Sequence, residues 1–248
     1  MNKKSIIGIF LLLSLIFLLS ACQLPFYQVV RGSGDIVSES FAVSNFNKIQ
    51  LDGAGQLIIN QGKSESLEIR AEDNVLEQLT VEVQGDTLVL GFKEQPWRSR
   101  IIPTKKIIYS LSIIDLIGIE INGAADLSLP ALETSSLTIE INGAGNIEID
   151  ELMADDLFVN LSGAGSMEIS GEVNSQDITI DGTGNYQAED LKSQKASIEI
   201  SGLGNGQLWV EDSLDVTISG GGSVEYFGSP SVSQDVSGLG DIRRMGDK

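Results

Sequence analysis

A short glycine turn recurs along the chain at nearly constant spacing, and this repeat limits the possible folds more than any other feature. From Gly123 onward, the first glycines of successive turns occupy positions 123, 143, 163, 182, 202, 220 and 238. Each of these turns is preceded by Asn, Asp or Ser, and each is followed by Asp, Asn or Ser. The nine near-copies occupy residues 32–35, 53–56, 123–126, 143–146, 163–166, 182–185, 202–205, 220–223 and 238–241.

Alternating apolar residues flank the turns. Leu137, Ile139 and Ile141 enter one turn, and Ile147 and Ile149 leave it. A two-residue period predicts strands with one buried face, and no stretch of the repeat region has a convincing helical period. Strand, turn, strand and a corner of about six residues, such as 151–156, make one coil of about 20 residues. Repeats of this kind bury their apolar faces only by stacking, so the pattern predicts an all-β parallel β-solenoid.

The turn glycines are expected to be structural. Glycine reaches positive φ without a Cβ clash, and it lets stacked backbones approach closely. The flanking Asn, Asp and Ser side chains can bond local backbone or the same residue type one coil away. The glycines assigned this role are Gly53, Gly55, Gly123, Gly143, Gly145, Gly163, Gly165, Gly182, Gly184, Gly202, Gly204, Gly220, Gly222, Gly238 and Gly240.

The repeat is irregular near its start. Residues 40–121 are predicted to form an N-terminal β layer that caps or extends the stack, with a hairpin turn at 84–87. Residues 93–106 look like a loop that holds Lys93, Arg98, Arg100, Lys105 and Lys106 around Trp97. This basic cluster could bind an anionic glycan or partner, although a solvated loop is the simpler interpretation. The regular coils are expected over 122–243, with a short tail at 244–248.

The N-terminus is typical of an export signal. Lys3 and Lys4 precede an apolar run from Ile6 to Leu19, which is short for a bilayer span. The run ends in Leu19-Ser20-Ala21-Cys22, which resembles the processing motif of bacterial lipoproteins. That resemblance implies that residues 1–21 are removed and that Cys22 is lipidated, with 22–39 as linker and first strand. An uncleaved anchor helix and an ordinary secretory signal are the alternatives.

Several coils also resemble a known family. Residues 121–124, 141–146 and 161–166 (INGA, INGAGN and LSGAGS) are similar to the signature of the head GIN domain, described as a putative auto-transporter adhesin head. The segment 224–230, VEYFGSP, is similar to that family as well. The resemblance covers about residues 40–243 and implies a right-handed single-stranded β-helix on secreted or lipid-anchored proteins. It brings no established catalytic or binding residues.

Composition excludes several classes of function. With 16 Lys and Arg against 35 Asp and Glu, the formal charge is −19, which repels phosphate backbones and argues against nucleic-acid binding. The chain has no histidine, the commonest general base and transition-metal ligand. Its single cysteine excludes a disulfide within the chain. No phosphate-binding loop or serine nucleophile stands out.

Acidic pairs are the remaining candidate for chemistry. Glu120 and Glu140 precede stacked turns, and Glu148 and Glu168 follow them. A Ca²⁺ ion could bridge such pairs, although a solvated acidic face is the simpler interpretation, so no cofactor beyond weak Ca²⁺ binding is expected. The sequence predicts a non-catalytic, membrane-anchored envelope protein that acts as an adhesin, scaffold or binding module for a surface glycan or envelope protein. The alternative is a carbohydrate-active enzyme.

Overall fold

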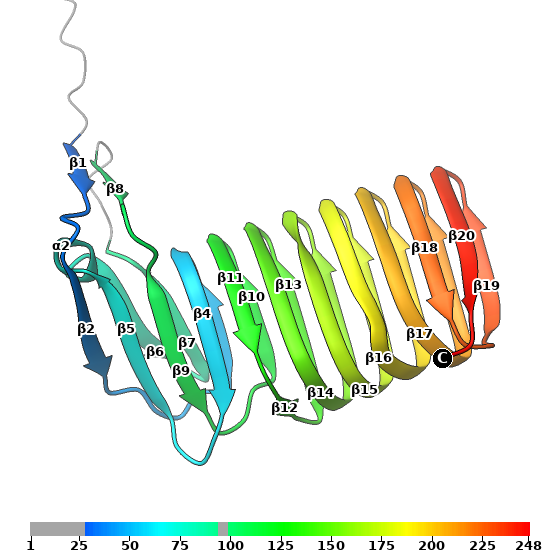
Figure 1. Cartoon of the computed structure of the whole chain (residues 1–248), viewed down its shortest axis with the longest axis horizontal. Helices are drawn as coiled ribbons and strands as arrows, with labels where there is room; N and C mark the ends of the chain where they lie inside the picture. The colour runs from blue at the N-terminus through cyan, green and yellow to red at the C-terminus, as the bar shows by residue number, and fades with distance from the viewer. Residues whose placement is uncertain (1–27, 94–98) are drawn as a thin grey trace, which may run out of the picture.

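The computed structural model describes residues 28–93 and 99–248, and most of that chain is β-strand in stacked parallel coils (Figure 1). The β-solenoid predicted from the glycine repeat is therefore confirmed. The predicted signal segment, Cys22, Trp97 and Arg98 lie outside the described residues. The regular coils contain β10 (Gly118–Ile121), β11 (Ala124–Leu129), β12 (Leu132–Glu133), β13 (Ser136–Ile141), β14 (Ala144–Leu161), β15 (Ala164–Ile180), β16 (Thr183–Ile200), β17 (Leu203–Ile218), β18 (Gly221–Phe227), β19 (Ser231–Val236) and β20 (Leu239–Gly246).

Each central coil is one continuous strand that runs from one glycine turn to the next. This differs from the predicted pair of strands around a separate corner at 151–156. The corner bends without losing its backbone pairing, because Met153 remains in register with Glu172 and Asp156 with Ser175. The bend is absorbed by a register shift between Ile149 and Leu152 and, on β15, by Gly171 at φ +129°.

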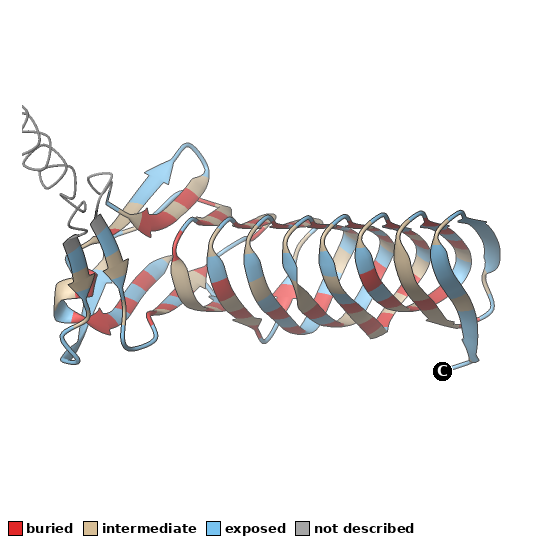
Figure 2. Cartoon of the chain, turned by 90° about the horizontal axis from the view of Figure 1, so that it is seen from above, coloured by how far each residue is buried: buried red, intermediate tan, exposed pale blue. Residues whose placement is uncertain are grey.

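The core is built from columns of identical position in successive coils. One column contains Ile141, Leu161, Ile180, Ile200 and Ile218, each fully buried and in register with the next. The alternating apolar residues are thus the inward face of the strands. Complete burial of such a side chain contributes about 1.5–3 kcal/mol. Figure 2 shows the buried and exposed segments alternating along each coil.

The N-terminal region begins with a coil that belongs to the stack. Strands β3 (Lys48–Leu51) and β4 (Ala54–Gln61) pair in parallel with β10 and β11, although the two pairs of strands are far apart in sequence. The chain thus completes one coil, forms the N-terminal cap with residues 62–117, and then places the next coil on the first.

The intervening residues cover the side of this first coil that faces away from β10 and β11. Strands β7 (Thr87–Phe92) and β9 (Ile108–Ile113) pair in parallel with β3 and β4. Antiparallel strands then follow on both sides: β6 pairs with β7, β5 with β9, and β2 with β5. The predicted hairpin turn joins β6 to β7, with Gly85 at φ +66°. These outer strands are β2 (Ile36–Phe41), β5 (Ser66–Glu72) and β6 (Leu79–Gln84), and α2 (Asp73–Leu76) is a single helical turn between β5 and β6.

A small two-stranded sheet lies beside this cap. Strand β1 (Gln28–Arg31) pairs in parallel with β8 (Ser99–Ile102). The segment 93–106, which was predicted to be a loop, therefore contains a strand. The cap is fastened to this sheet by the buried carboxylate of Glu72. It accepts hydrogen bonds from the Gly34 amide (2.8 Å), the Thr104 amide (2.8 Å) and hydroxyl (2.5 Å), and the Lys105 amide (3.2 Å). The Thr104 hydroxyl and the backbone donors hold the pKa of Glu72 below its ordinary value, against the effect of burial.

Candidate functional site

The glycine turns form two columns along the stack. In the first column, a Cβ on each glycine from Gly123 onward would lie 1.7–2.0 Å from the carbonyl oxygen of the glycine in the coil beneath. The residue after each of these glycines donates its amide to that same carbonyl at 2.8–3.0 Å. The first column is Gly53, Gly123, Gly143, Gly163, Gly182, Gly202, Gly220 and Gly238, and the second contains Gly55, Gly145, Gly165, Gly184, Gly204, Gly222 and Gly240.

The reason for glycine is close stacking rather than backbone conformation. Among the glycines of the two columns, all within the described part of the chain, Gly55 alone has a clearly positive φ, at +152°. The expectation that the turns need positive φ is therefore wrong for the others. The copy at residues 32–35 is also not part of the columns, because a Cβ on Gly32 would meet the Glu72 carboxylate instead.

Polar side chains beside the turns bond from coil to coil. The Asn122 amide donates to Asp52 (2.8 Å), Asn142 donates to Asn122 (2.9 Å), and the Ser162 hydroxyl donates to Asn142 (2.9 Å). A second row follows the turns, in which Asn146 donates to Asp126 at 3.1 Å. These side chains serve as hydrogen-bond donors and acceptors for one another, so the polar rows beside the turns have a structural role.

One polar chain lies inside the core. The Tyr186 hydroxyl donates to Gln176 Oε1 (2.8 Å), Gln176 Nε2 donates to the Ser193 hydroxyl (2.8 Å), and Ser193 donates to the Trp209 carbonyl (2.9 Å). Burial raises the pKa of the Tyr186 hydroxyl above its usual range, so it stays a neutral donor. All three side chains of this chain are buried, and their hydrogen bonds go to one another and to the backbone.

A row of outward-facing side chains lies on one corner of the solenoid. Strand register places six outward side chains next to one another, and we call this row the corner ladder. It holds acids, an exposed methionine, a lysine and two aromatic rings, spread over five strand spacings, or about 24 Å. The corner ladder is Glu133, Met153, Glu172, Lys192, Trp209 and Phe227.

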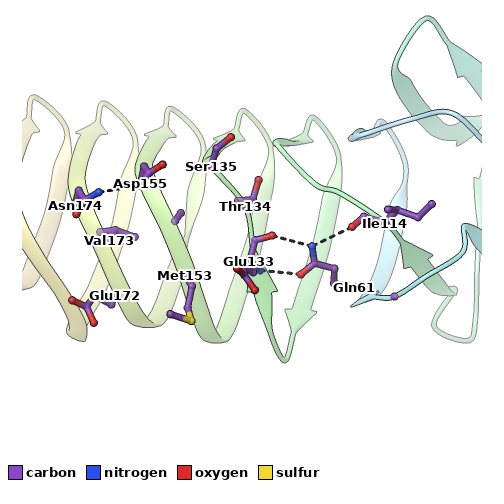
Figure 3. Close-up of a pocket in the computed structure, with 12 residues that line it drawn as sticks. Gln61, Ile114, Glu133, Thr134, Ser135, Met153, Asp155, Glu172, Val173 and Asn174 are labelled. Atoms are coloured by element: carbon purple, nitrogen blue, oxygen red, sulfur yellow. Dashed lines mark hydrogen bonds between the residues drawn. The ribbon is translucent and has the colours of Figure 1, made fainter.

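An open groove of about 770 Å³ adjoins the acidic end of the corner ladder (Figure 3). Gln61 closes one side, because its amide donates to the carbonyls of Ile114 (3.1 Å) and Glu133 (2.9 Å) and accepts from the Glu133 amide (2.9 Å). Asn174 donates to Asp155 in the adjacent coil at 2.9 Å. The groove is thus lined by carboxylates, those of Glu133, Asp155 and Glu172, beside the apolar surface of Ile114 and Met153.

The other end of the corner ladder is aromatic and cationic. The ammonium groups of Lys192 and Lys248 lie 5.9 and 5.8 Å from the centre of the Trp209 ring, and Lys248 lies 5.1 Å from that of Phe227. The sequence pattern had not indicated this pair of rings. Their spacing in sequence equals that between Gly202 and Gly220 in the same two coils, and that signal could have placed them side by side.

The predicted acid pairs are neighbours in the stack. Glu120 is in register with Glu140, and Glu148 with Glu168. The next coil offers Asn160 beside Glu140, so the acidic row ends there. Within the residues placed by the structure, no group of three or more potential metal-ligating side chains comes together. Weak Ca²⁺ binding stays a prediction.

Two members of the predicted basic cluster make contacts within the chain. Lys106 pairs with Asp126 at 3.0 Å, and the Lys93 ammonium donates to the Glu77 carbonyl at 2.5 Å. The Lys106 contact, followed by a hydrogen bond from Asn146, holds the pKa of Asp126 below its ordinary value. Arg100 is exposed on β8. Over residues 28–93 and 99–248, no helix is long and apolar enough to span a bilayer.

Comparisons with known proteins agree with this architecture. The family model described as "Putative auto-transporter adhesin, head GIN domain" matches residues 45–230. A solved structure described as a putative adhesin from Bacteroides fragilis is 27% identical, with a TM-score of 0.82 over 87% of this chain and 100% of that chain. No curated protein sequence matched.

Two further solved structures share the fold. One is described as a putative lipid binding protein from Parabacteroides distasonis, at 21% identity and a TM-score of 0.73, covering 88% of this chain and 100% of that chain. The other is described as a putative adhesin from Parabacteroides merdae, at 22% identity and a TM-score of 0.64, covering 88% and 99%. None of the three is described as an enzyme.

Proposed function

The chain belongs to the head GIN domain family, and from this we propose that it is a lipid-anchored, adhesin-like binding module of the cell envelope. The observation that carries the proposal is the corner ladder, which aligns acids, a lysine and two aromatic rings along the solenoid axis. Such a row suits an adhesin, because the rigid solenoid already holds the side chains in place. A ligand that contacts several coils at once can then bind without ordering any part of the protein.

The chemistry of the corner ladder favours a surface glycan. Aromatic rings provide flat faces for the C–H surface of a sugar, while carboxylates and ammonium groups bond its hydroxyls. Trp209 and Phe227 supply the rings at one end, and Glu133 and Glu172 the acceptors at the other. A polymer laid along the axis would reach both ends.

The anchor is proposed at Cys22. The apolar run and the small residues before the cysteine support export and lipidation at this position. Several acyl chains on one residue hold a protein at a membrane far more firmly than one chain does. In this proposal the solenoid is exported and remains attached through its N-terminal end.

Binding of the detergent-solubilised full chain to an array of bacterial glycans tests the glycan proposal. Replacement of Trp209 by Ala should weaken binding about tenfold, since it removes the stacking surface. Phe158→Ala is the matched control, because Phe158 is an exposed aromatic on another face of the coil. Circular dichroism and thermal unfolding verify that both variants are folded.

The same assay separates the alternatives. Equal binding by wild type and the Trp209 variant would reject the corner ladder as the binding surface. Bound glycans are also measured for chain length over time, with and without Ca²⁺. Shortened glycans would overturn the non-catalytic assignment and make Glu133, Asp155 and Glu172 the first residues to replace.

A further inference from the structure

The last coil of the solenoid ends in open strand edges. Within the described chain, β19 pairs only with β17, and β20 only with β18. Every residue of β19 is exposed, and Figure 2 shows this end as an almost continuous exposed surface. An open edge is a template for another strand unless something covers it.

The final residues do not cover this edge. The Arg244 guanidinium turns back to the Gly228 carbonyl (2.7 Å), and the Lys248 ammonium pairs with Asp190 on the earlier strand β16. Lys248 also lies over the rings of Trp209 and Phe227. The tail therefore packs along the side of the stack and leaves its end open.

Backbone groups of alternate residues point away from the stack at this end. The Leu239 amide donates to Gly220 in the coil beneath. Because neighbouring residues in a strand bond to opposite sides, the free groups of β20 belong to Gly240, Ile242 and Arg244.

The same alternation applies to β19. The carbonyl of Ile218 accepts two amides from the following coil, and Val236 occupies the equivalent position one coil later. The free groups of β19 therefore belong to Val232, Gln234 and Val236.

We propose that a second copy of the chain binds this end, with β20 antiparallel to β20 of the second copy about a twofold axis at Ile242. This register places Asp241 opposite Arg243 of the second copy, and Leu239 opposite Met245 of the second copy. Leu239 is 89% exposed and Met245 46%, so the register covers two of the exposed apolar side chains of this coil. Each contact occurs twice, as an isologous interface requires.

Strand β19 fits the same axis. Gln234 and Ile242 each lie four positions from Gly238 in the last turn, so they face each other across the coil. An axis through both residues sets Val232 opposite Val236 of the second copy on the inner face. On the outer face it sets Ser233 opposite Asp235 of the second copy, a donor against an acceptor.

Neighbouring registers lack this match. An axis through Asp241 would place Asp241 opposite its own copy, and an axis through Arg243 would place two arginines together. Like charges directly opposite each other destabilise a strand pair. The charge pattern of β20 thus selects Ile242 as the centre.

The pairing would have a geometric consequence for adhesion, which rests on the function proposed above. Figure 1 shows the N-terminal cap at one end of the stack and β20 at the other. Two copies that meet at β20 would therefore form a rod of double length with their N-terminal ends pointing in opposite directions. Two anchors at opposite ends can lie in two different membranes. The second copy is then the partner of an adhesin in homophilic contact.

Charge reversal tests the interface in solution. The full chain in detergent should sediment as a dimer, and Asp241→Arg or Arg243→Asp alone should raise the dissociation constant at least tenfold. A mixture of these two variants should dimerise again, because each then meets an opposite charge. A monomeric wild type, or no restoration on mixing, would overturn the proposal.

Cysteine cross-linking tests the register independently. In a Cys22→Ser background, Leu239→Cys with Met245→Cys should give a disulfide-linked dimer, since the paired Cα atoms would be about 4.5 Å apart. Either substitution alone should give none, because the two copies of one residue would be about 20 Å apart. Equal cross-linking by a single variant would contradict this register. If the chain proves monomeric and still binds glycan, the proposed function stands and only the dimer proposal is rejected.

Discussion

The carbonyl oxygen of Gly123 lies so close to Gly143 in the next coil that a Cβ on Gly143 would approach it to 1.9 Å. The same contact recurs in every later coil of the first glycine column, where the obstructing atom is always backbone. A side chain at this position must therefore separate two coils rather than displace a flexible neighbour.

Gly143→Ala should destabilise the protein by about 3 kcal/mol, at the upper end of overpacking penalties. For a chain of this size, the melting temperature should fall by about 6–12 °C, measured by calorimetry or circular dichroism. Gly221→Ala is the matched control, because it lies at the middle position of a turn, where other coils carry Ala144 and Ala164. A Cβ there lies 3.1 Å from the flexible Leu203 side chain and 3.9 Å from the Leu239 carbonyl oxygen, which is ordinary contact, so the control should change stability little. Equal losses from both variants would contradict the close-stacking explanation.

The buried Tyr186–Gln176 hydrogen bond should show energetic coupling. Gln176→Leu leaves the Tyr186 hydroxyl without its acceptor and should cost about 1–3 kcal/mol in urea unfolding. The double variant Gln176→Leu/Tyr186→Phe should recover part of this loss, because both polar groups are then absent. Strict additivity of the two single variants would show that the bond contributes nothing.

Tyr109 offers the opposite case in the N-terminal cap. Its hydroxyl is buried, and no hydrogen-bond partner for it occurs among the residues that the structure places. Tyr109→Phe should therefore leave stability unchanged or raise it by about 1 kcal/mol, whereas Tyr186→Phe lowers it. A loss of stability in the Tyr109 variant would indicate a partner for its hydroxyl.

Glu72 should make the attachment of the β1–β8 sheet sensitive to acid. Its pKa is lowered in the folded protein, so the stability it contributes is present above its ordinary value of 4.5 and is lost as pH falls through the lowered value. Amide hydrogen exchange at residues 32–35 and at Thr104 and Lys105 should accelerate over that acidic range. Glu72→Gln should show fast exchange already at neutral pH, with little further change on acidification.

Glu68→Gln is the control for this experiment, because Glu68 lies on the same strand and is exposed. It should leave the acid-dependent exchange of these two segments in place. Acid-dependent exchange that persists in the Glu72 variant would assign the effect to another group.

Cys22 should carry the membrane anchor. Mass spectrometry of the chain expressed in a bacterium should find an N-terminal fragment that begins at an acylated Cys22. Cys22→Ser should abolish incorporation of radiolabelled fatty acid and leave residues 1–21 attached. A labelled serine variant, or a wild type cleaved elsewhere, would contradict the lipoprotein assignment.

The regular coils are the part of the fold that could be predicted from sequence. The two-residue period of apolar residues decides which side chains face inward. The longer period of the glycine turns decides which residues stack, as in the column that includes Ile141 and Leu161. The importance of the turn glycines was predicted, but one of the two proposed reasons was wrong. Backbone separation between coils, which decides the Gly143 contact, does not appear in a sequence pattern.

The cap was harder to predict, because its partners are distant and partly antiparallel. Nothing in residues 62–117 repeats, so no spacing indicates that β9 lies between β4 and β5. The corner ladder lies between these cases. Its residues follow from the repeat once the register is known. In the linear sequence, however, nothing in the residues around Trp209 or Phe227 indicates that the two rings are neighbours.

The return of the chain to its first coil also determines how the protein can fold. Most coils find their neighbours one repeat away in sequence, whereas Asn122 must reach back to Asp52 across the whole cap segment. Closing the longer loop costs more conformational entropy before any contact forms, so the distal coils should assemble first and the N-terminal coil last. The end nearest the proposed anchor would then be the final part to become native, and slow refolding kinetics should be confined to it.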